Sequence, residues 1–404
     1  MSIMRIATIA TGQNLQRLIY LAICGLICTY IGVLGISILI GSWLFDENGR
    51  PLATDFIAFW GAGKLVLQGH AADAYNWDLH KSISTAESGA TFDGYFSWQY
   101  PPTFLIVTAA LALLSYPAAL VAWMATGITL YAAAIRLIGN TRVAILAAMA
   151  WPPVLWNTVV GQNGFITAAL LGAAIASIEK RPALAGLCFG LLTYKPQFGL
   201  MIPLALIAGG FWRVIGWAAV STTVMIMLSI GLFGAEIWSD FFDAAAKVNG
   251  TILVDGRADF SKLQSLYGFV RALGWNWTLA WTAQGLLIAV LSAGIIWIWR
   301  QKVAFDVKAA ALATVTILAS PYAFIYDFVA LAIPLAFLGK SGFSAKECAV
   351  VIFAGILLVS GPSEHLATAF LSALLVLGLV VGRAWQAFPT LGFAGWSAQR
   401  ELKP

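Results

Sequence analysis

Charged side chains are scarce in this sequence. Asp, Glu, Lys and Arg make up 10% of its 404 residues, against roughly 25% in soluble domains, and 60% of the residues are hydrophobic. So few charges cannot cover the two or three soluble domains that this length would otherwise suggest, and the sequence predicts one integral membrane domain over residues 1–404. The net charge of +5 comes from basic residues scattered between apolar runs, which favours lipid headgroups rather than nucleic acid as partners.

Cysteine and histidine are also few. The four cysteines lie in apolar segments and form no paired spacing in a polar loop, which argues against structural disulfides and zinc. The three histidines are dispersed and form no HExxH motif. No P-loop, nucleophile elbow or Rossmann glycine fingerprint is convincing. A metal site built on histidine, or one of the common nucleotide-binding motifs, therefore has little support.

Long apolar runs dominate what is present. The first, 18–44, can cross a hydrocarbon core of roughly 30 Å, and the acid-free, basic residues 1–17 predict an uncleaved anchor with the N-terminus inside. Twelve candidate spans in all predict an all-α, polytopic transmembrane bundle with a cytoplasmic tail at 383–404. The other eleven runs lie at about 103–115, 118–138, 143–158, 164–178, 183–208, 213–233, 277–299, 305–319, 326–339, 347–361 and 366–382.

Between residues 139 and 210 the basic residues fit this count less well. Arg142, Lys180 and Arg181 would fall outside, against the usual bias, and Trp151-Pro152-Pro153 interrupts its own run. A re-entrant or half-length segment is the alternative here, because such a segment is tolerated where it lines a protein cavity or water.

Two polar intervals, 45–102 and 235–277, are predicted to lie together on the outer side of the membrane. In the first, Phe56, Phe59 and Trp60 begin an apolar helical face, which predicts an amphipathic helix lying along the membrane surface. A second short amphipathic helix is expected at 78–87. The outer face is therefore the expected working face.

Asp55 stands directly before the first of these helices. Aspartate is a common N-cap residue, so helix capping is one interpretation. The other is a general base, because nearby apolar surface raises the pKa of a carboxyl group and the same loop supplies Lys64, Gln99 and Tyr100 as polar company. Both interpretations remain open from the sequence.

Three further polar breaks interrupt the apolar runs. Gln162 and Asn163 form either a turn or a pair of amides that bind sugar hydroxyls. Lys195 costs on the order of 2.5 to 3.5 kcal/mol to insert, so it either snorkels or binds an anionic phosphate. Asp327, at the end of the segment 320–327, is either stabilised by a helix dipole or paired with Lys195 or a loop arginine.

These segments form an ordered series: DFIAFWGAGKLVLQG, YPP, GQNGFITAALL, GLLTYKPQFGL, KLQSLYGFVR and SPYAFIYD. Over about Asp55 to Pro334 the series resembles glycosyltransferase family 87, membrane mannosyltransferase-like proteins of the GT-C superfamily. Each motif is short, so their order and spacing carry the resemblance. One departure is Tyr322, where family members often have a histidine.

The resemblance implies inverting transfer of a sugar, with mannose as the first candidate, from a polyprenyl-phosphate sugar to a hydroxyl of a glycolipid or glycan. The reaction would take place at the outer face of a bacterial inner membrane. Asp55 would be the catalytic base, and Lys195, Arg257 and Arg271 would bind the donor phosphate, so that no metal or other cofactor is needed. The residues expected to bind substrate are Lys64, Gln99, Tyr100, Gln162, Asn163, Gln264, Tyr322 and Asp327.

Two other classes of function compete with this one. A transporter or flippase of a lipid-linked sugar would also use an intramembrane Lys195 and broken helices, although no sequence repeat of the kind that many transporters carry is evident. It would move lipid without forming a glycosidic bond. A structural scaffold would need neither the two polar loops nor the mid-span lysine.

Overall fold

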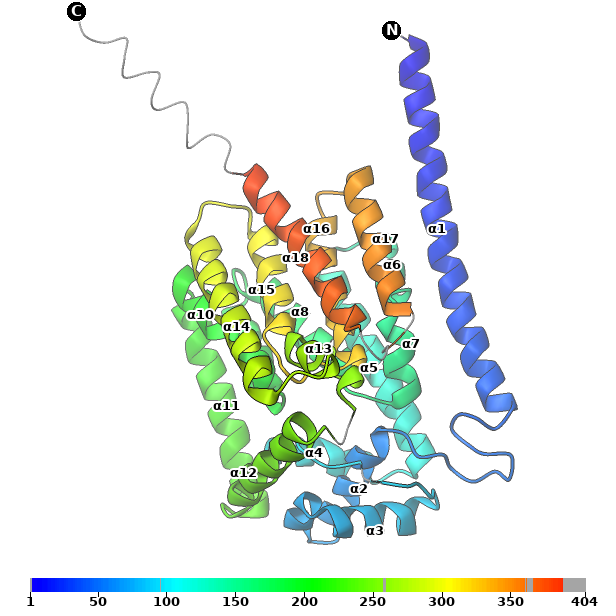
Figure 1. Cartoon of the computed structure of the whole chain (residues 1–404), viewed down its shortest axis with the longest axis vertical. Helices are drawn as coiled ribbons and strands as arrows, with labels where there is room; N and C mark the ends of the chain where they lie inside the picture. Colours follow the sequence, from blue (N-terminus) through cyan, green and yellow to red (C-terminus); the bar gives the residue numbers. More distant parts are fainter. Residues whose placement is uncertain (1, 95, 257–258, 360, 362–365, 388–404) are drawn as a thin grey trace, which may run out of the picture.

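The computed structural model describes residues 2–94, 96–256, 259–359, 361 and 366–387, with side chains from residue 17 onward (Figure 1). The regular elements within these ranges are helices, and isolated bridges join Trp43 with Phe45 and Phe45 with Pro51. The prediction of an all-α fold is confirmed.

The elements are named in chain order. The N-terminal part contains α1 (Ser2–Leu39), α2 (Phe56–Leu67), the 3-10 helix η1 (Ala71–Tyr75), α3 (Trp77–Ser88), α4 (Pro102–Leu111), α5 (Tyr116–Ile138), α6 (Arg142–Met149), α7 (Pro153–Val160) and α8 (Gly164–Ser177). The middle part contains α9 (Pro182–Leu191), η2 (Leu192–Tyr194), η3 (Pro196–Gly199), α10 (Met201–Gly209), α11 (Trp212–Phe233), α12 (Ile237–Val248), the π-helix η4 (Asn249–Val254), η5 (Phe260–Lys262) and α13 (Leu266–Ala272). The C-terminal part contains α14 (Trp277–Arg300), α15 (Phe305–Leu318), η6 (Ile325–Leu331), α16 (Ala332–Gly339), α17 (Ala345–Val359) and α18 (Thr368–Gln386).

Five helices of the described chain are long and apolar enough to cross a membrane: 17–39 of α1, α5, α11, α14 and α18. A sixth span results if α6 and α7, which meet at an angle of 58°, form one broken crossing. The bend falls at Pro152 and Pro153, as expected where proline removes backbone hydrogen bonds. The chain is therefore a membrane protein, and the total of twelve spans stays a prediction.

The apolar run 183–208 is two helices instead of one span. α9 begins beside Glu179, and Glu179 interacts electrostatically with Lys308. α10 ends beside Phe211, and the Phe211 ring lies 5.8 Å from that of Trp299. Lys308 and Trp299 are hydrogen-bonded to each other, so both ends of the α9–α10 pair lie at the same end of the molecule. This segment is thus re-entrant, and its tip is at Lys195.

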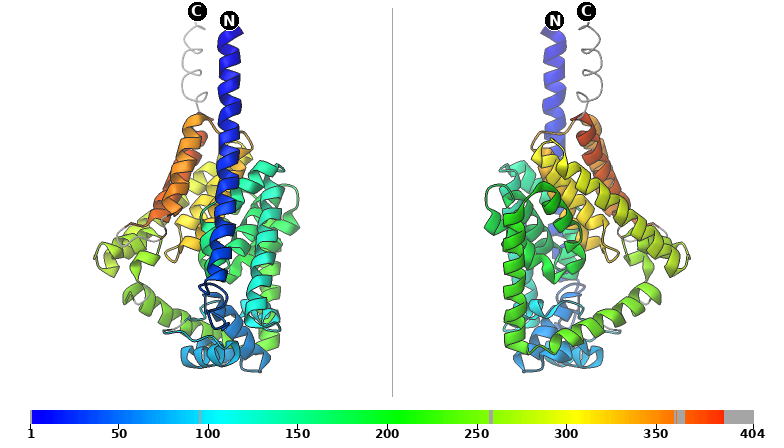
Figure 2. Two further views of the ribbon diagram at one scale, coloured as in Figure 1. Left: turned by 90° about the vertical axis from the view of Figure 1, so that its right-hand side faces the viewer. Right: turned by 90° about the vertical axis from the view of Figure 1, so that its left-hand side faces the viewer.

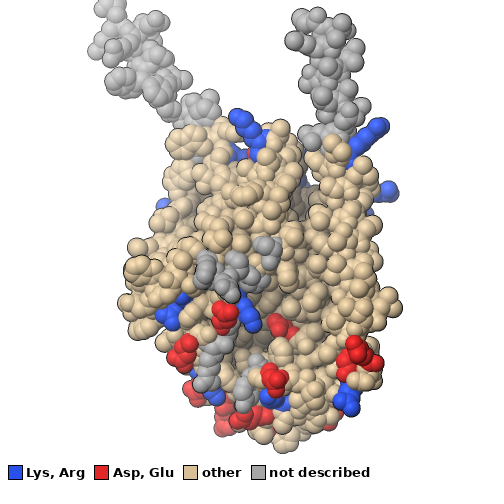
Figure 3. All heavy atoms as spheres, turned by 45° about the vertical axis from the view of Figure 1, so that its right-hand side comes forward, with Lys and Arg blue, Asp and Glu red and all other residues tan. Residues whose placement is uncertain are grey.

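The reversal also accounts for two of the three basic residues that fit poorly in the sequence. Lys180 and Arg181 precede α9 and therefore lie at the same end as Arg300 and Lys308. In Figure 3 the opposite, lower end carries most of the visible Asp and Glu side chains, and the surface between the ends is largely free of charge. This distribution is expected of a bundle whose middle lies in lipid.

The first polar interval and the beginning of the second meet at one end of the molecule. Figure 1 places α2, α3, α4 and α12 together, opposite the end at which α1 begins and α18 finishes. The rings of Tyr75 and Phe241 lie 6.1 Å apart, and Lys247 lies over Trp77 at 4.5 Å, so the two loops touch. From this base the second loop runs obliquely outward to α13 (Figure 2).

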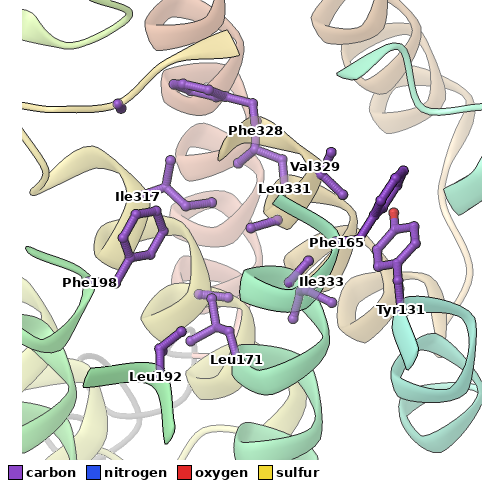
Figure 4. Packing of buried hydrophobic residues seen from close by; sticks show 14 of the residues in the cluster. Tyr131, Phe165, Leu171, Leu192, Phe198, Ile317, Phe328, Val329, Leu331 and Ile333 are labelled. Atoms are coloured by element: carbon purple, nitrogen blue, oxygen red, sulfur yellow. The ribbon is translucent and has the colours of Figure 1, made fainter. Parts of the chain in front are cut away.

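The centre of the bundle is packed around α8 and η6. α8 is buried on most of its surface, and all seven residues of η6 are buried. Figure 4 shows Phe165 of α8 beside Val329 of η6, and Leu171 of α8 beside Leu192 of η2. The Trp151 indole also donates to the Phe328 carbonyl oxygen at 3.0 Å. η6 is therefore held rigidly in the middle of the protein.

The helix after Asp55 is buried on more than one face. α4 covers one side of α2, and α3 with η1 covers another, so the expected single apolar face is not observed. His80 of α3, whose pKa burial lowers to about 4, donates from Nε2 to the Ala58 carbonyl oxygen at 2.9 Å. Gly61 and Gly63 permit this packing, because a Cβ on either would collide with α3 or α4.

Replacing Gly63 with alanine is expected to destabilise the protein by about 1 to 3 kcal/mol, because the new methyl group would meet the Thr108 carbonyl oxygen of α4. Denaturant unfolding in detergent measures this change. The matched control is Gly216→Ala in α11, where no atom lies within 4 Å of the added Cβ and alanine is the better helix former. Equal stability of the two variants would show that α2 is not packed this tightly.

Candidate active site

A buried ion pair joins the tips of two broken segments. Nζ of Lys195, at the re-entrant tip, lies 2.5 Å from Oδ1 of Asp327 in η6, and the two side chains are 4% and 2% exposed. Asp327 also caps its own helix, because Oδ2 accepts from the Phe324 backbone N–H at 3.0 Å. Lys195 therefore does not snorkel, and the predicted alternative of a pair with Asp327 is confirmed.

A cavity of about 240 Å³ opens beside this pair. Four parts of the chain line it: the end of the first loop, the re-entrant tip, α12 and the segment 322–327. It contains five of the residues predicted from the sequence to bind substrate or phosphate: Gln99, Tyr100, Lys195, Tyr322 and Asp327. The aromatic rings of Tyr194, Phe241, Phe324 and Tyr326 complete much of its wall. Such a mixture of aromatic surface and a few polar groups is typical of small-molecule sites.

Asp55 does not cap its helix with its side chain, so that interpretation is wrong. Its Oδ2 instead accepts a hydrogen bond from Nε2 of Gln162 at 3.2 Å. Burial raises the pKa of the Asp55 carboxyl group, while the Gln162 hydrogen bond and the charge of Lys262 act in the opposite direction. Asp55 is thus a carboxylate whose surroundings favour a proton acceptor stronger than an ordinary aspartate.

Gln162 and Tyr100 connect Asp55 to the cavity. The Tyr100 hydroxyl donates to Oε1 of Gln162 at 3.4 Å, and its ring lines the cavity wall. The charges of Asp55 and Asp327 both act on Tyr100, so this tyrosine lies near both carboxylates. The Asn163 side chain is buried and lies beside both Tyr100 and Gln162.

Tyr322 also lines the cavity. Its hydroxyl donates to Oδ1 of Asn249 in η4 at 3.4 Å, and burial raises its pKa, so the hydroxyl stays protonated at neutral pH. Tyr322 can therefore present a neutral oxygen to the cavity but no cationic imidazolium.

Three other predicted residues are not brought to the cavity. Lys64 pairs with Glu87 at 3.6 Å and lies over Trp60. Both ends of the Gln264 side chain are bound to backbone, Nε2 to the Ser261 carbonyl oxygen and Oε1 to the Ala369 N–H. The Arg271 guanidinium donates to the Val254 and Trp275 carbonyl oxygens. Arg257 lies outside the described residues.

Lys262 is the residue that sequence reasoning did not single out. It lies in η5 of the second loop, is exposed, and is near enough to Asp55 for its charge to act on the carboxylate. The sequence offers no signal for this approach, because 206 residues separate the two positions and the loop contains several other cations.

Fold and site together define a helical membrane protein in which a polar cavity and a partly buried carboxylate lie next to two loops at one end of the bundle. The sequence model of glycosyltransferase family 87 matches residues 98–321, more than half of the chain, and the chain belongs to this family. Searches of curated proteins and of solved structures returned no match. The matched range contains Tyr100, Gln162 and Lys195, whereas Asp55 and Asp327 lie outside it.

Proposed function

We propose that this glycosyltransferase uses a polyprenyl-phosphate sugar, with mannose as the first candidate, and transfers it with inversion to a hydroxyl of a glycolipid or glycan. The supporting observation is the partly buried Asp55 carboxylate, which Gln162 and Tyr100 link to a polar cavity at the loop end of the bundle. A lipid-linked donor stays in the membrane, so its enzyme needs such a site at the membrane edge. We propose that this end lies at the outer face of a bacterial inner membrane, because Lys180, Arg181 and Arg300 lie at the opposite end.

In the proposed reaction, Asp55 removes the proton of the acceptor hydroxyl while that oxygen attacks the anomeric carbon of the donor. The bond between the anomeric carbon and the phosphate oxygen breaks, and its electron pair leaves with polyprenyl phosphate. The proton remains on Asp55 until solvent removes it. Because one displacement inverts the carbon and its transition state resembles an oxocarbenium ion, a single base on the acceptor side is sufficient.

The leaving phosphate needs positive charge. Lys195 gives one N–H to Asp327 and retains two further donors at the cavity wall. Lys262 adds a second cation from the loop side. A single phosphate carries less negative charge than a diphosphate. We therefore propose that positioned lysines stabilise it without a metal.

A transporter of a lipid-linked sugar is the second candidate, supported by the re-entrant α9–α10 segment and its buried ion pair. Broken helices near the middle of a bundle are common in transporters. Such a protein would move the lipid between leaflets, whereas a transferase changes its covalent structure.

Proteoliposomes that contain the purified protein, labelled polyprenyl-phosphate mannose, a glycolipid acceptor and EDTA distinguish these proposals. We expect an acceptor heavier by one hexose, together with free polyprenyl phosphate. Movement of label across the bilayer without this product would favour the transporter. Loss of the product only when EDTA is present would overturn the proposal of metal-free transfer.

A further inference from the structure

The Gln162 side chain is bound at both ends inside the protein. Nε2 donates to Oδ2 of Asp55 at 3.2 Å, and Oε1 accepts from the Tyr100 hydroxyl at 3.4 Å and from the Asn163 backbone N–H at 3.3 Å. The residue is only 8% exposed. Its carbonyl oxygen therefore has no acceptor capacity left for a sugar hydroxyl.

These partners fix the direction of the amide. A backbone N–H can only donate, so the Gln162 atom that faces Asn163 must be the oxygen. The NH₂ group then points to Asp55, whose ionised carboxylate can only accept. Because the Asn163 N–H can only donate, it fixes the Gln162 oxygen on its own side and directs the NH₂ group to Asp55.

The backbone around Gln162 is built to bring it against Asp55. Gly161 ends α7 with a φ of +72°, and a Cβ at this position would lie 2.7 Å from both Phe56 and Leu120. Only glycine combines this left-handed conformation with so close an approach. The end of α7 is thereby packed against the start of α2, where Asp55 stands.

We infer that Gln162 is a positioning residue that holds Oδ2 of Asp55 and leaves Oδ1 to receive the proton of the acceptor hydroxyl. No residue of the described chain hydrogen-bonds Oδ1 of Asp55, in contrast to Oδ2. This inference rests on the proposed role of Asp55 as the base. It takes the place of sugar binding by the Gln162 carbonyl oxygen, and it makes Tyr100 the link through which an occupied cavity acts on Asp55.

A hydrogen bond from a neutral amide favours the ionised form of a carboxylate, so Gln162 opposes the effect of burial on the pKa of Asp55. The other titratable groups facing Asp55 are Lys262 and the tyrosines Tyr100, Tyr116 and Tyr326. Tyrosine ordinarily titrates near pH 10. Asp327 in the cavity wall is a second carboxylate that acts on Tyr100, so a shift of the acid-side fall in activity reports Asp55 when it follows substitution of Gln162 and not of Gln99.

The test is the pH dependence of kcat/KM in Gln162→Leu and Gln162→Glu enzymes. Because the base acts only when ionised, activity falls as pH drops through the pKa of Asp55. In Gln162→Leu we expect this fall to move about one pH unit upward, with most of the rate recovered at higher pH. Gln162→Glu, which keeps the side-chain size, should move it further, because two adjacent carboxylates oppose each other's ionisation.

Gln99→Leu is the matched control, since it removes an amide from the cavity wall without touching Asp55. Its KM can change, but its acid-side fall should stay at the parental pH. If Gln162→Leu instead raises KM equally at every pH and leaves the fall in place, Gln162 binds sugar and the positioning role is overturned. That result, with an inactive Asp55→Asn enzyme, would leave the base assignment intact, whereas a parental rate in Asp55→Asn would overturn both.

Discussion

Asp55→Asn enzyme is expected to transfer sugar about 10² to 10⁴ times more slowly than the parent, because the change removes the proposed general base. Asparagine keeps the size of the side chain, and its carbonyl oxygen can still accept the hydrogen bond from Gln162. The loss should therefore appear mainly in kcat and should not be accompanied by unfolding. Initial rates with saturating donor and acceptor, together with a thermal unfolding curve in detergent, measure both quantities.

The control for this substitution is Asp73→Asn in the same loop. The Asp73 side chain is 40% exposed, pairs with His70 at the surface and does not line the cavity. It undergoes the same chemical change, so we expect activity within about a factor of two of the parent, as surface ion pairs contribute little. A parental rate in Asp55→Asn would exclude Asp55 as the base and leave the family assignment in place, since that assignment rests on residues 98–321.

Hydropathy predicted where the apolar helices lie in the sequence better than whether each of them crosses the membrane. A run such as 183–208 shows that a segment is long enough to cross a membrane, but the same composition suits a segment that turns back inside the bundle. The local signal was Lys195 followed by Pro196, since proline disfavours a continuous helix. The direction of the return depends on packing of α9 and α10 against α11 and α14, which no local sequence pattern encodes.

The site could be predicted where a polar residue was costly in its surroundings. Lys195 and Asp327 stand in apolar segments, where an unpaired charge is costly, and they form an ion pair with each other. Gln162 was recognised as a residue of the site, although its contact with Asp55 joins positions 107 residues apart. The cost of an unpaired charge does not identify site residues in the polar loops. A cation there, such as Arg271, can hydrogen-bond to carbonyl groups of its own loop at little cost.

Lys195→Met enzyme is expected to be both less stable and much less active. The substitution leaves Asp327 without its cation in a buried site, and breaking a buried pair in this way costs about 3 to 5 kcal/mol. It also removes the ammonium group that we propose for the leaving phosphate, a loss worth about 10²- to 10³-fold in kcat. Denaturant unfolding in detergent and initial rates of sugar transfer measure the two effects.

The double variant Lys195→Met/Asp327→Asn separates these effects. It removes both charges, and asparagine retains an oxygen for the Phe324 N–H, so most of the stability should return. If Lys195 binds phosphate, activity stays low in this stable protein, because no cation replaces the lost ammonium group. If activity returns with stability, the pair only holds the re-entrant tip against η6, and the phosphate must be bound by Lys262 or another loop cation. The same buried pair can thus be structural, catalytic or both, and only the charge-free protein tells these apart.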